Sequence, residues 1–342
     1  MDTFDLIATL IKLGLVFALT MLGVMVMILA ERRVSALMQY RLGPNRTGFG
    51  GILQPVADGL KFFFKEDIIP ANANRFIYLL APVMAMVPAL MTFAIVPFGA
   101  PLEVGGRIVP LQVADINIGI LYILALTSVG VYGLVLAGWG SGSKYPLMGG
   151  LRSSAQLISY ELAMGLAIVG VIMISEGLTF NAIIAHQQEF GWNFWKQPLA
   201  AVIFLIAIFA ETNRLPIDLT EAEQELVGGY HTEYSSFKFA MFFMSEYANM
   251  ITASAFMVCL FFGGWDVPFV DESLMGGWGV IVSFMAFAAK MIFILFFYIW
   301  VRWTLPRFRY DQLMRLGWMY LLPLALLNVL ITGFVLVIIA WD

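Results

Sequence analysis

Charged residues are scarce in this sequence. Only 12% of the 342 residues are Asp, Glu, Lys or Arg, whereas 61% are hydrophobic and the mean hydropathy is +0.87. A water-soluble chain of this length carries far more charge on its surface, so the composition predicts a polytopic membrane protein. The net charge of −4 is small and negative, which argues against nucleic acid as a partner.

Cysteine and histidine are also nearly absent. Cys259 is the only cysteine, which excludes a disulfide framework and an iron–sulfur cluster held by this chain alone, and it is interpreted as a small apolar residue of a helix. His186 and His231 fall in loops on opposite sides of the predicted bundle, so they do not form a haem site across helices. The sequence has no phosphate-binding loop and no glycine-rich dinucleotide motif. We therefore expect no metal site and no complete redox centre in this chain.

The sequence contains many long apolar runs. Eight of them are long enough, or nearly so, to cross a bilayer. They lie at about 7–30, 76–98, 116–138, 155–175, 198–212, 238–263, 280–302 and 320–340. The predicted fold is therefore all-α, a single integral membrane domain over residues 1–342 with eight transmembrane helices. The first run is too long for a cleavable signal peptide, and no convincing repeat relates the two halves.

Basic residues are distributed unevenly between the predicted loops. Fifteen of them follow spans 1, 3, 5 and 7, whereas only Arg107 and Lys196 follow spans 2, 4 and 6. Because basic loops stay in the cytoplasm, the odd-numbered loops are expected there and both termini on the outer face. In that orientation Glu161, Glu211 and Glu246, from three different spans, share one layer near the cytoplasmic side.

Ionisable side chains inside membrane spans usually mark ion or proton routes. Lys290, near the middle of the seventh span, is a possible partner for the three carboxylates across the bundle. Each of these four residues, taken alone, is also explained as a snorkelling or locally paired side chain. Together they predict a polar path that opens toward an acidic loop.

That acidic loop, residues 211–234, lies between the fifth and sixth spans. Pro216 is expected to end the preceding helix, and a short helix from about Leu219 to Val227 is expected to follow it. Its carboxylates surround one arginine, Arg214, and they are Glu211, Asp218, Glu221, Glu223, Glu225 and Glu233. Carboxylates crowded beside a membrane are costly and usually functional, although a solvated acidic loop without a special role is the alternative.

The first long loop contains a predicted amphipathic helix from Gln54 to Glu66. Phe63 and Phe64 belong to its apolar face, with Val56 and Leu60. Such a helix lies at the membrane interface or under a docked partner. Asp58, on the polar face, is interpreted either as a functional residue or as the partner of Lys61 in an i,i+3 salt bridge.

Two segments carry a family resemblance. Residues 210–230 (AETNRLPIDLTEAEQELVGGY) resemble a motif of the H subunit of NADH:quinone oxidoreductase, respiratory complex I, and residues 51–66 (GILQPVADGLKFFFKE) resemble a second. Further matches are Glu31–Arg32, Arg41–Asn45, Gly138–Trp139, Ser143–Tyr145, Leu151–Ser153, Ser159–Glu161 and Pro306–Gln312. The resemblance covers almost the whole chain. Ile217 departs from it, because the family usually has phenylalanine there, but the change affects packing more than chemistry.

The resemblance implies a membrane subunit that walls the chamber through which quinone, the substrate, reaches the last iron–sulfur cluster. FMN and the iron–sulfur clusters then belong to partner subunits. The implied partners are peripheral iron–sulfur and quinone-site subunits, small membrane subunits, antiporter-like subunits and membrane lipids. The implied chamber residues are Arg32, Arg41, Asp58, Glu211, Arg214, Asp218, Glu221, Glu223 and Glu225. The implied proton path is formed by Glu161, Glu246, Lys290, Arg302 and Arg307.

Other functions remain open at this point. A homologous subunit of an energy-converting hydrogenase or of a related quinone reductase shares parts of these motifs. A stand-alone proton-coupled transporter would function without partners, but it leaves the long polar loops unexplained. A passive membrane anchor would keep coupling intact when its buried carboxylates are removed. We expect the bacterial plasma membrane as the location, with the mitochondrial inner membrane as the alternative.

Overall fold

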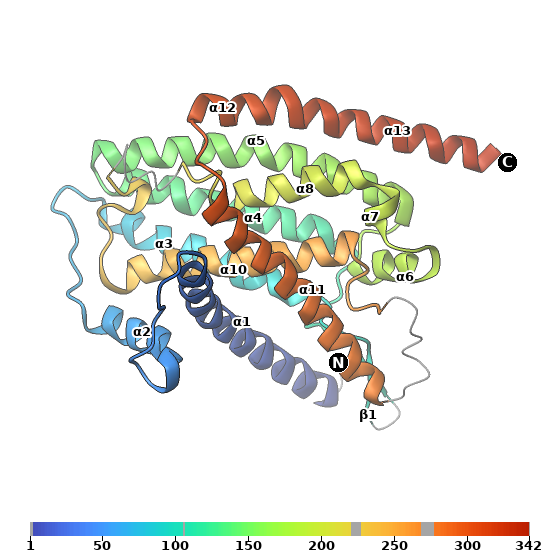
Figure 1. Cartoon of the computed structure of the whole chain (residues 1–342), viewed down its shortest axis with the longest axis horizontal. Helices are drawn as coiled ribbons and strands as arrows, with labels where there is room; N and C mark the ends of the chain where they lie inside the picture. The colour runs from blue at the N-terminus through green and yellow to red at the C-terminus, as the bar shows by residue number, and fades with distance from the viewer. Residues whose placement is uncertain (1–2, 105–106, 220–226, 268–276, 342) are drawn as a thin grey trace.

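The computed structural model describes residues 3–104, 107–219, 227–267 and 277–341, and nearly all of them are helical (Figure 1). The α-helices are α1 (Thr3–Met38), α2 (Gln54–Phe64), α3 (Arg75–Met91), α4 (Gly119–Gly140), α5 (Lys144–Ser175), α6 (Phe180–Phe190), α7 (Asn193–Lys196), α8 (Pro198–Glu211), α10 (Ser236–Phe261), α11 (Gly277–Thr304), α12 (Tyr310–Arg315) and α13 (Leu322–Trp341). Short 3₁₀ turns occupy Phe49–Gly51, Thr92–Ile95 and Gly229–His231, and a π-helical turn over Leu316–Leu321 joins α12 to α13. The all-α prediction is confirmed, with one small addition. Strands β1 (Leu102–Val104) and β2 (Arg107–Val109) pair as an antiparallel hairpin that the sequence did not predict.

Six of the eight predicted spans are confirmed within the described residues as helices long and apolar enough to cross a bilayer. They are Leu6–Met38, Arg75–Ile95, Gly119–Gly140, Lys144–Ser175, Trp278–Thr304 and Tyr310–Ala340. The predicted fifth and sixth spans coincide with α8 and α10, so the total of eight stays a prediction. α8 has 14 residues, which correspond to about 21 Å against a hydrocarbon core of about 30 Å. α10 has 26 residues and is long enough, but polar residues such as Ser245, Glu246 and Asn249 lower its hydropathy.

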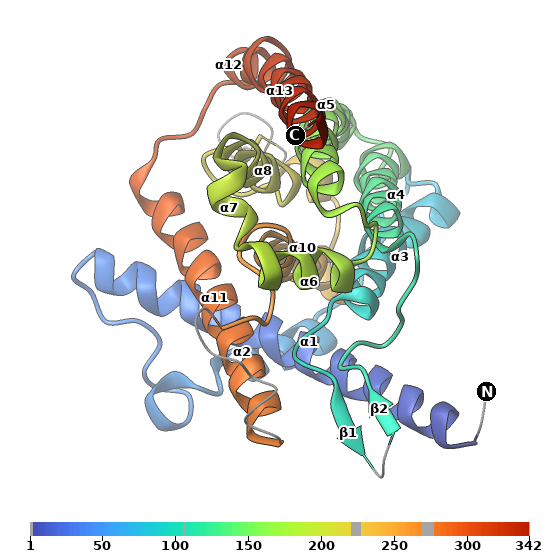
Figure 2. The ribbon, with the colours of Figure 1, turned by 90° about the vertical axis from the view of Figure 1, so that its right-hand side faces the viewer.

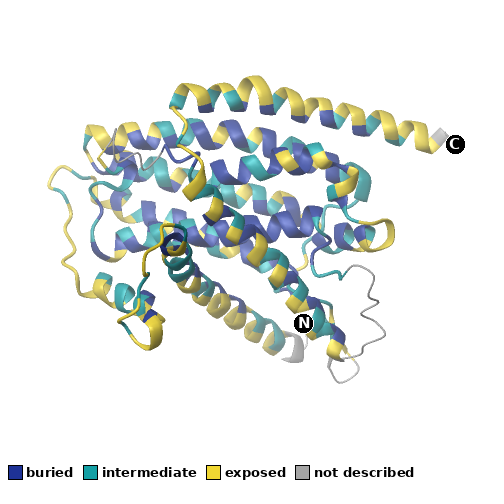
Figure 3. Cartoon of the chain, in the orientation of Figure 1, coloured by how far each residue is buried: buried dark blue, intermediate teal, exposed yellow. Residues whose placement is uncertain are grey.

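The position of α10 explains why it carries polar residues. Viewed along the bundle, α10 lies in the middle, between α8 and α3, with α5 and α4 beside them (Figure 2). Most of its C-terminal half is buried, whereas α1 and α13 expose long apolar faces (Figure 3). A helix that contacts protein on all sides meets little lipid, so hydroxyl and carboxylate groups on it find partners among neighbouring helices.

Glycine allows the helices beside α10 to pack closely. At Gly133 of α4, an added Cβ would lie 2.7 Å from the backbone nitrogen of Ala85 in α3. No side chain fits at that distance, so the close approach of α3 and α4 requires glycine at this position.

The two ends of the bundle differ. Both termini lie at one end, which we call the terminal end, and α2 lies at the opposite end, which we call the α2 end (Figure 1). α2 covers Gln54–Phe64, close to the predicted 54–66, and its apolar face is exposed, with Phe63 at 67% and Phe64 at 87%. The hydroxyl of Ser236 holds its C-terminus by donating to the carbonyls of Phe62 and Lys65, both at 2.9 Å.

The loop after α8 begins close to the predicted end of the fifth span, at about 212. α8 ends at Glu211, five residues before Pro216, because Asn213 adopts a left-handed conformation with φ +51°. The amide of Arg214 then donates to the carbonyl of Phe209 at 3.2 Å, which is the hydrogen bond of a Schellman C-cap. The short helix predicted from about Leu219 to Val227 falls mostly on residues 220–226, which lie outside the described residues.

Candidate functional site

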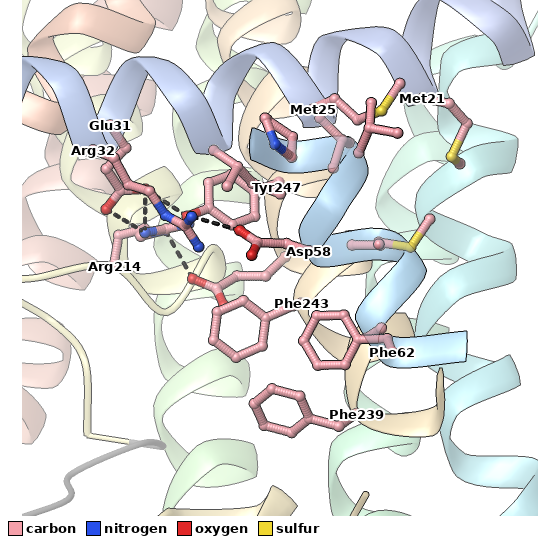
Figure 4. A pocket seen from close by; sticks show the side chains of 18 of the residues that line it. Met21, Met25, Glu31, Arg32, Asp58, Phe62, Arg214, Phe239, Phe243 and Tyr247 are labelled. Atoms are coloured by element: carbon pink, nitrogen blue, oxygen red, sulfur yellow. Dashed lines mark hydrogen bonds and ion pairs between the residues drawn. The ribbon is translucent and has the colours of Figure 1, made fainter. Parts of the chain in front are cut away.

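A cavity of about 860 Å³ lies at the α2 end of the bundle. α1, α2, α10 and α11 form its walls together with the loop after α8 (Figure 4). Charged side chains gather in one part of it, and apolar side chains line the rest, including Met21 and Met25 of α1 and Phe239 and Phe243 of α10. The cavity therefore combines a polar region, which makes directed hydrogen bonds, with an apolar wall.

Arg214 is the centre of the charged region. Its Nη1 donates to both carboxylate oxygens of Glu31, each at 3.1 Å, and its Nε forms an ion pair with Glu246 at 2.8 Å. The guanidinium also lies 4.4 Å from the ring centre of Tyr247. Burial alone lowers the pKa of Arg214, but the carboxylates of Glu246 and Glu31 raise it well above its usual range. Arg214 is therefore a permanent positive charge between two carboxylates.

Glu31 connects this centre to α11. Its carboxylate accepts a hydrogen bond from the Tyr247 hydroxyl at 2.7 Å and pairs with Arg302 as well as Arg214. Glu31 and Tyr247 were not assigned to the site from the sequence. The sequence feature that could have identified Glu31 is a carboxylate at the end of the first apolar run, within the Glu31–Arg32 motif. Its partner Arg214 is 183 residues away in the chain, so no local spacing linked the two.

Two further ion pairs flank the cavity. Arg307 pairs with Asp218 at 2.7 Å, which ties the segment after α11 to the loop after α8. Arg32 of α1 pairs with Asp58 of α2. In this structure Asp58 therefore bridges two helices, and the predicted i,i+3 bridge to Lys61 is not among its observed contacts.

The structure brings most predicted chamber residues together. Those that line the cavity are Arg32, Arg41, Asp58, Arg214 and Asp218, and two residues predicted for the proton path, Glu246 and Arg302, line it too. Glu211 does not line this cavity. The predicted residues Glu221, Glu223 and Glu225 lie outside the described residues.

A second, smaller cavity of about 40 Å³ adjoins the first. Glu211 and Glu246 both line it, together with Thr127 and Asn249. Its volume accommodates about two or three water molecules. Glu161 lies close enough to Glu211 for their charges to repel, and it accepts a hydrogen bond from Ser128. The structure thus brings together carboxylates from three helices, but Glu161 lies in the middle of α5, so the cluster is deeper in the bundle than the α2 end.

Lys290 lies elsewhere. Its ammonium group donates to the carbonyls of Phe262 and Gly264, at 2.8 and 3.1 Å, beyond the C-terminal end of α10. This position is at the terminal end of the bundle, away from the layer that contains Glu211 and Glu246. Among the described residues, no group of three or more His, Cys, Asp or Glu side chains is arranged to hold a metal ion.

The charged region and the apolar wall together suit an amphipathic ligand. Guanidinium and hydroxyl groups supply hydrogen-bond donors for a polar head group, and the methionine and phenylalanine side chains accommodate an apolar tail. The second cavity continues from the charged region into the bundle, since Glu246 borders both cavities.

The chain is similar to known proteins over nearly its whole length. A profile of the NADH dehydrogenase family matches residues 11–333. Three relatives are H subunits of NADH-quinone oxidoreductases. The chain is 54% identical over 340 residues to the second H subunit of Geobacter metallireducens, covering 96% of this chain and 95% of that protein. It is 52% identical over 332 residues to the H subunit of Thermomicrobium roseum, covering 94% of each chain. It is 48% identical over 341 residues to the H subunit of Flavobacterium psychrophilum, covering 99% of each chain.

Proposed function

The chain belongs to the NADH dehydrogenase family, and from this premise we propose that its larger cavity admits a quinone and couples quinone reduction to proton movement. It is a membrane subunit of an NADH-quinone oxidoreductase, the enzyme for which its relatives are named. The electrons reach the quinone from FMN and iron–sulfur clusters in partner subunits. This chain contributes binding surface and charged side chains.

The shape of the cavity supports a quinone as the ligand. Its volume of about 860 Å³ lies within the range of small-molecule pockets, about 300–1,000 Å³. A quinone ring has two carbonyl oxygens, which accept hydrogen bonds from groups such as those of Arg32 and Arg41 at the cavity. Its isoprenoid tail is apolar and matches the side of the cavity formed by Met21, Met25 and Phe243. Ubiquinone and menaquinone share both features.

The arrangement of the helices supports a position in the membrane. The predicted cytoplasmic loops, including α2, lie at the α2 end, and both termini lie at the opposite end (Figure 1). In the proposed orientation the α2 end faces the cytoplasm of a bacterium, where the peripheral iron–sulfur and quinone-site subunits dock. The small membrane subunits, the antiporter-like subunits and lipids then contact the exposed apolar faces within the plasma membrane.

The observation that carries the coupling proposal is that Glu246 borders both cavities. Reduction of a quinone to a quinol consumes two electrons and two protons, so negative charge develops at the head group before the protons arrive. That charge attracts Arg214 and weakens its ion pair with Glu246. Glu246 is then free to bind a proton that travels from Glu161 and Glu211 through the smaller cavity.

The remaining predicted residues support this path in different ways. Arg302 shares Glu31 with Arg214, and Arg307 holds Asp218, so both arginines adjust the charge balance at the cavity. Lys290, at the terminal end, is outside the part of the path that joins the two cavities. The loop glutamates between Asp218 and Val227 stay predicted chamber residues.

The test is purification of the chain from native membranes in mild detergent, followed by assay of what comes with it. We expect iron–sulfur subunits and NADH:quinone activity sensitive to quinone-site inhibitors. In the same complex, Glu246→Gln is expected to lower proton pumping at least tenfold while assembly is preserved. Glu189→Gln, an exposed carboxylate at the terminal end, is the matched control and is expected to leave both activities unchanged.

Each other outcome favours a different function. A stable solitary protein with ion flux in liposomes would favour a transporter. Recovery with hydrogenase subunits would favour a subunit of an energy-converting hydrogenase. Normal coupled turnover of the Glu246→Gln complex would favour a passive anchor and would refute the coupling proposal.

A further inference from the structure

Lys290, in the middle of α11, is held by the backbone that follows α10. Its Nζ donates to the carbonyls of Phe262 at 2.8 Å, Gly264 at 3.1 Å and Asp266 at 2.5 Å. The ammonium group also lies 4.8 Å from the ring centre of Trp192. Three carbonyls and an aromatic face surround this one cation.

The chain after α10 is shaped to present these carbonyls. The last carbonyls of a helix have no partner within the helix, and a cation near them is stabilised by the helix dipole. Gly263 and Gly264 both adopt positive φ, +72° and +56°, and turn the backbone back over the helix end. At Gly264 an added Cβ would lie 2.4 Å from the side chain of Ile184, so the turn is also pressed against α6. The carbonyls therefore converge on the position of the Lys290 ammonium group.

Two buried amides hold the same end of α10 from the other side. Gln187 of α6 donates to the carbonyl of Cys259 at 2.8 Å, and Asn193 of α7 donates to the carbonyl of Leu260 at 3.0 Å. The side-chain oxygen of Gln187 accepts a hydrogen bond from the amide of Gly263 at 3.0 Å. Gln187 and Asn193 are almost completely buried. Side chains of α6, α7 and α11 thus donate hydrogen bonds to the backbone carbonyls at the end of α10, in place of water.

We propose that Lys290 is a positioning residue, which fixes α11 on the end of α10 and thereby sets the width of the cavity at the other end of the same two helices. α10 contributes Glu246 and Tyr247 to the cavity, and α11 contributes Arg302 and Trp303. α11 runs obliquely to α10 (Figure 1), and the Lys290 anchor joins the two helices beyond the C-terminal end of α10.

The distance between Lys290 and Arg302 along α11 determines how far a tilt of this helix moves the cavity wall. Arg302 follows Lys290 by twelve residues in α11, which corresponds to about 18 Å along the axis. A tilt of about 5° about Lys290 would displace Arg302 by about 1.6 Å, which is enough to break a hydrogen bond. The anchor is independent of what the cavity binds, whereas its effect on quinone rests on the proposed function.

The experiment compares Lys290→Met and Lys290→Arg in the assembled complex. Hydrogen exchange of a peptide over residues 258–267 measures the anchor, and quinone kinetics with proton pumping measure the cavity. For Lys290→Met we expect at least tenfold faster exchange, a KM for quinone raised about fivefold, kcat within twofold, and an unchanged number of protons per electron. Lys290→Arg, which also donates several hydrogen bonds, should restore slow exchange and most of the quinone affinity. Lys196→Met, an exposed lysine at the same end, is the matched control with native behaviour.

Unchanged exchange in Lys290→Met would overturn the anchor, and fast exchange with an unchanged KM would overturn its link to the cavity. A Lys290→Arg complex with native exchange but lost pumping would identify Lys290 as a proton carrier and overturn the proposal. If Lys290→Met does not assemble, Lys290→Gln should show intermediate exchange and KM, and native values there would refute the anchor. A wild-type complex without quinone reductase activity would refute the proposed function, whatever the exchange shows.

Discussion

Removal of Arg214 tests whether the charged cluster is held together by a single guanidinium. In Arg214→Met the carboxylates of Glu31 and Glu246 lose the cation that lies between them. Breaking a buried ion pair by removing one partner costs about 3–5 kcal/mol. Arg302 and Tyr247 still bind Glu31, so we expect about 3 kcal/mol, at the lower end of that range.

The effect is measurable as a shift in thermal stability. The entropy of unfolding is about 2.1 cal/mol/K per residue, or about 0.7 kcal/mol/K for a chain of 342 residues. Arg214→Met should therefore lower the melting temperature of this subunit within the complex by about 4 °C. Arg214→Lys keeps the charge but reaches one carboxylate at a time, so it should lie between Met and the wild type. Arg214 stays charged at every accessible pH, because its pKa is raised. Because protonation neutralises a buried carboxylate that has lost its cation, the loss should be smaller at pH 6 than at pH 9.

A double-mutant cycle makes the reasoning refutable. Glu246→Gln removes one of the carboxylates that Arg214→Met leaves unpaired, so the double variant should recover about 1–3 kcal/mol relative to the sum of the single changes. Additive effects of the two substitutions would mean that Arg214 and Glu246 do not interact energetically. The same result would remove the electrostatic basis of the proposed coupling.

Two further predictions concern residues that hold the loop and α2 in place. Gln156 is fully buried, and its amide donates to two backbone carbonyls at either side of the loop that carries Arg214. Gln156→Leu leaves the carbonyl of Ile217 without this donor, whereas the carbonyl of Ala210 keeps the amide of Asn213. The substitution should therefore destabilise the subunit by about 1–3 kcal/mol, and native stability measured by thermal unfolding would contradict this. Asp58→Asn removes the pair with Arg32, which is partly exposed, so stability should fall by no more than about 1 kcal/mol. The KM for quinone should rise severalfold and become less sensitive to salt, and an unchanged salt dependence would exclude a role for this pair at the cavity.

The sequence alone was sufficient for the class of the fold and for the family. Scarce charge and apolar runs of about 20 residues indicate a bundle of membrane helices, because a helix of that length crosses the bilayer with its backbone hydrogen bonds satisfied. The acidic segment after the fifth run carries the family resemblance, and the depth of Glu161, Glu211 and Glu246 followed from counting 1.5 Å per residue along their helices. The fold class and the family are confirmed because they depend on composition and on local motifs, whereas the depth of the three carboxylates in a membrane stays a prediction.

Contacts between helices depend on which face of each helix meets which neighbour, and the sequence does not contain that information in any local spacing. Asp58 has Lys61 three residues away, yet it pairs with Arg32 on another helix. Glu31 joins Arg214 and Arg302 only after α1, the loop after α8 and α11 have packed around one cavity. The sequence suggested Lys290 as a partner for the three carboxylates, whereas the tilt of α11 places its ammonium group on the carbonyls beyond α10. The depth of each ionisable group is a property of its own helix, whereas its partner is set by the three-dimensional packing of helices that are far apart in the chain.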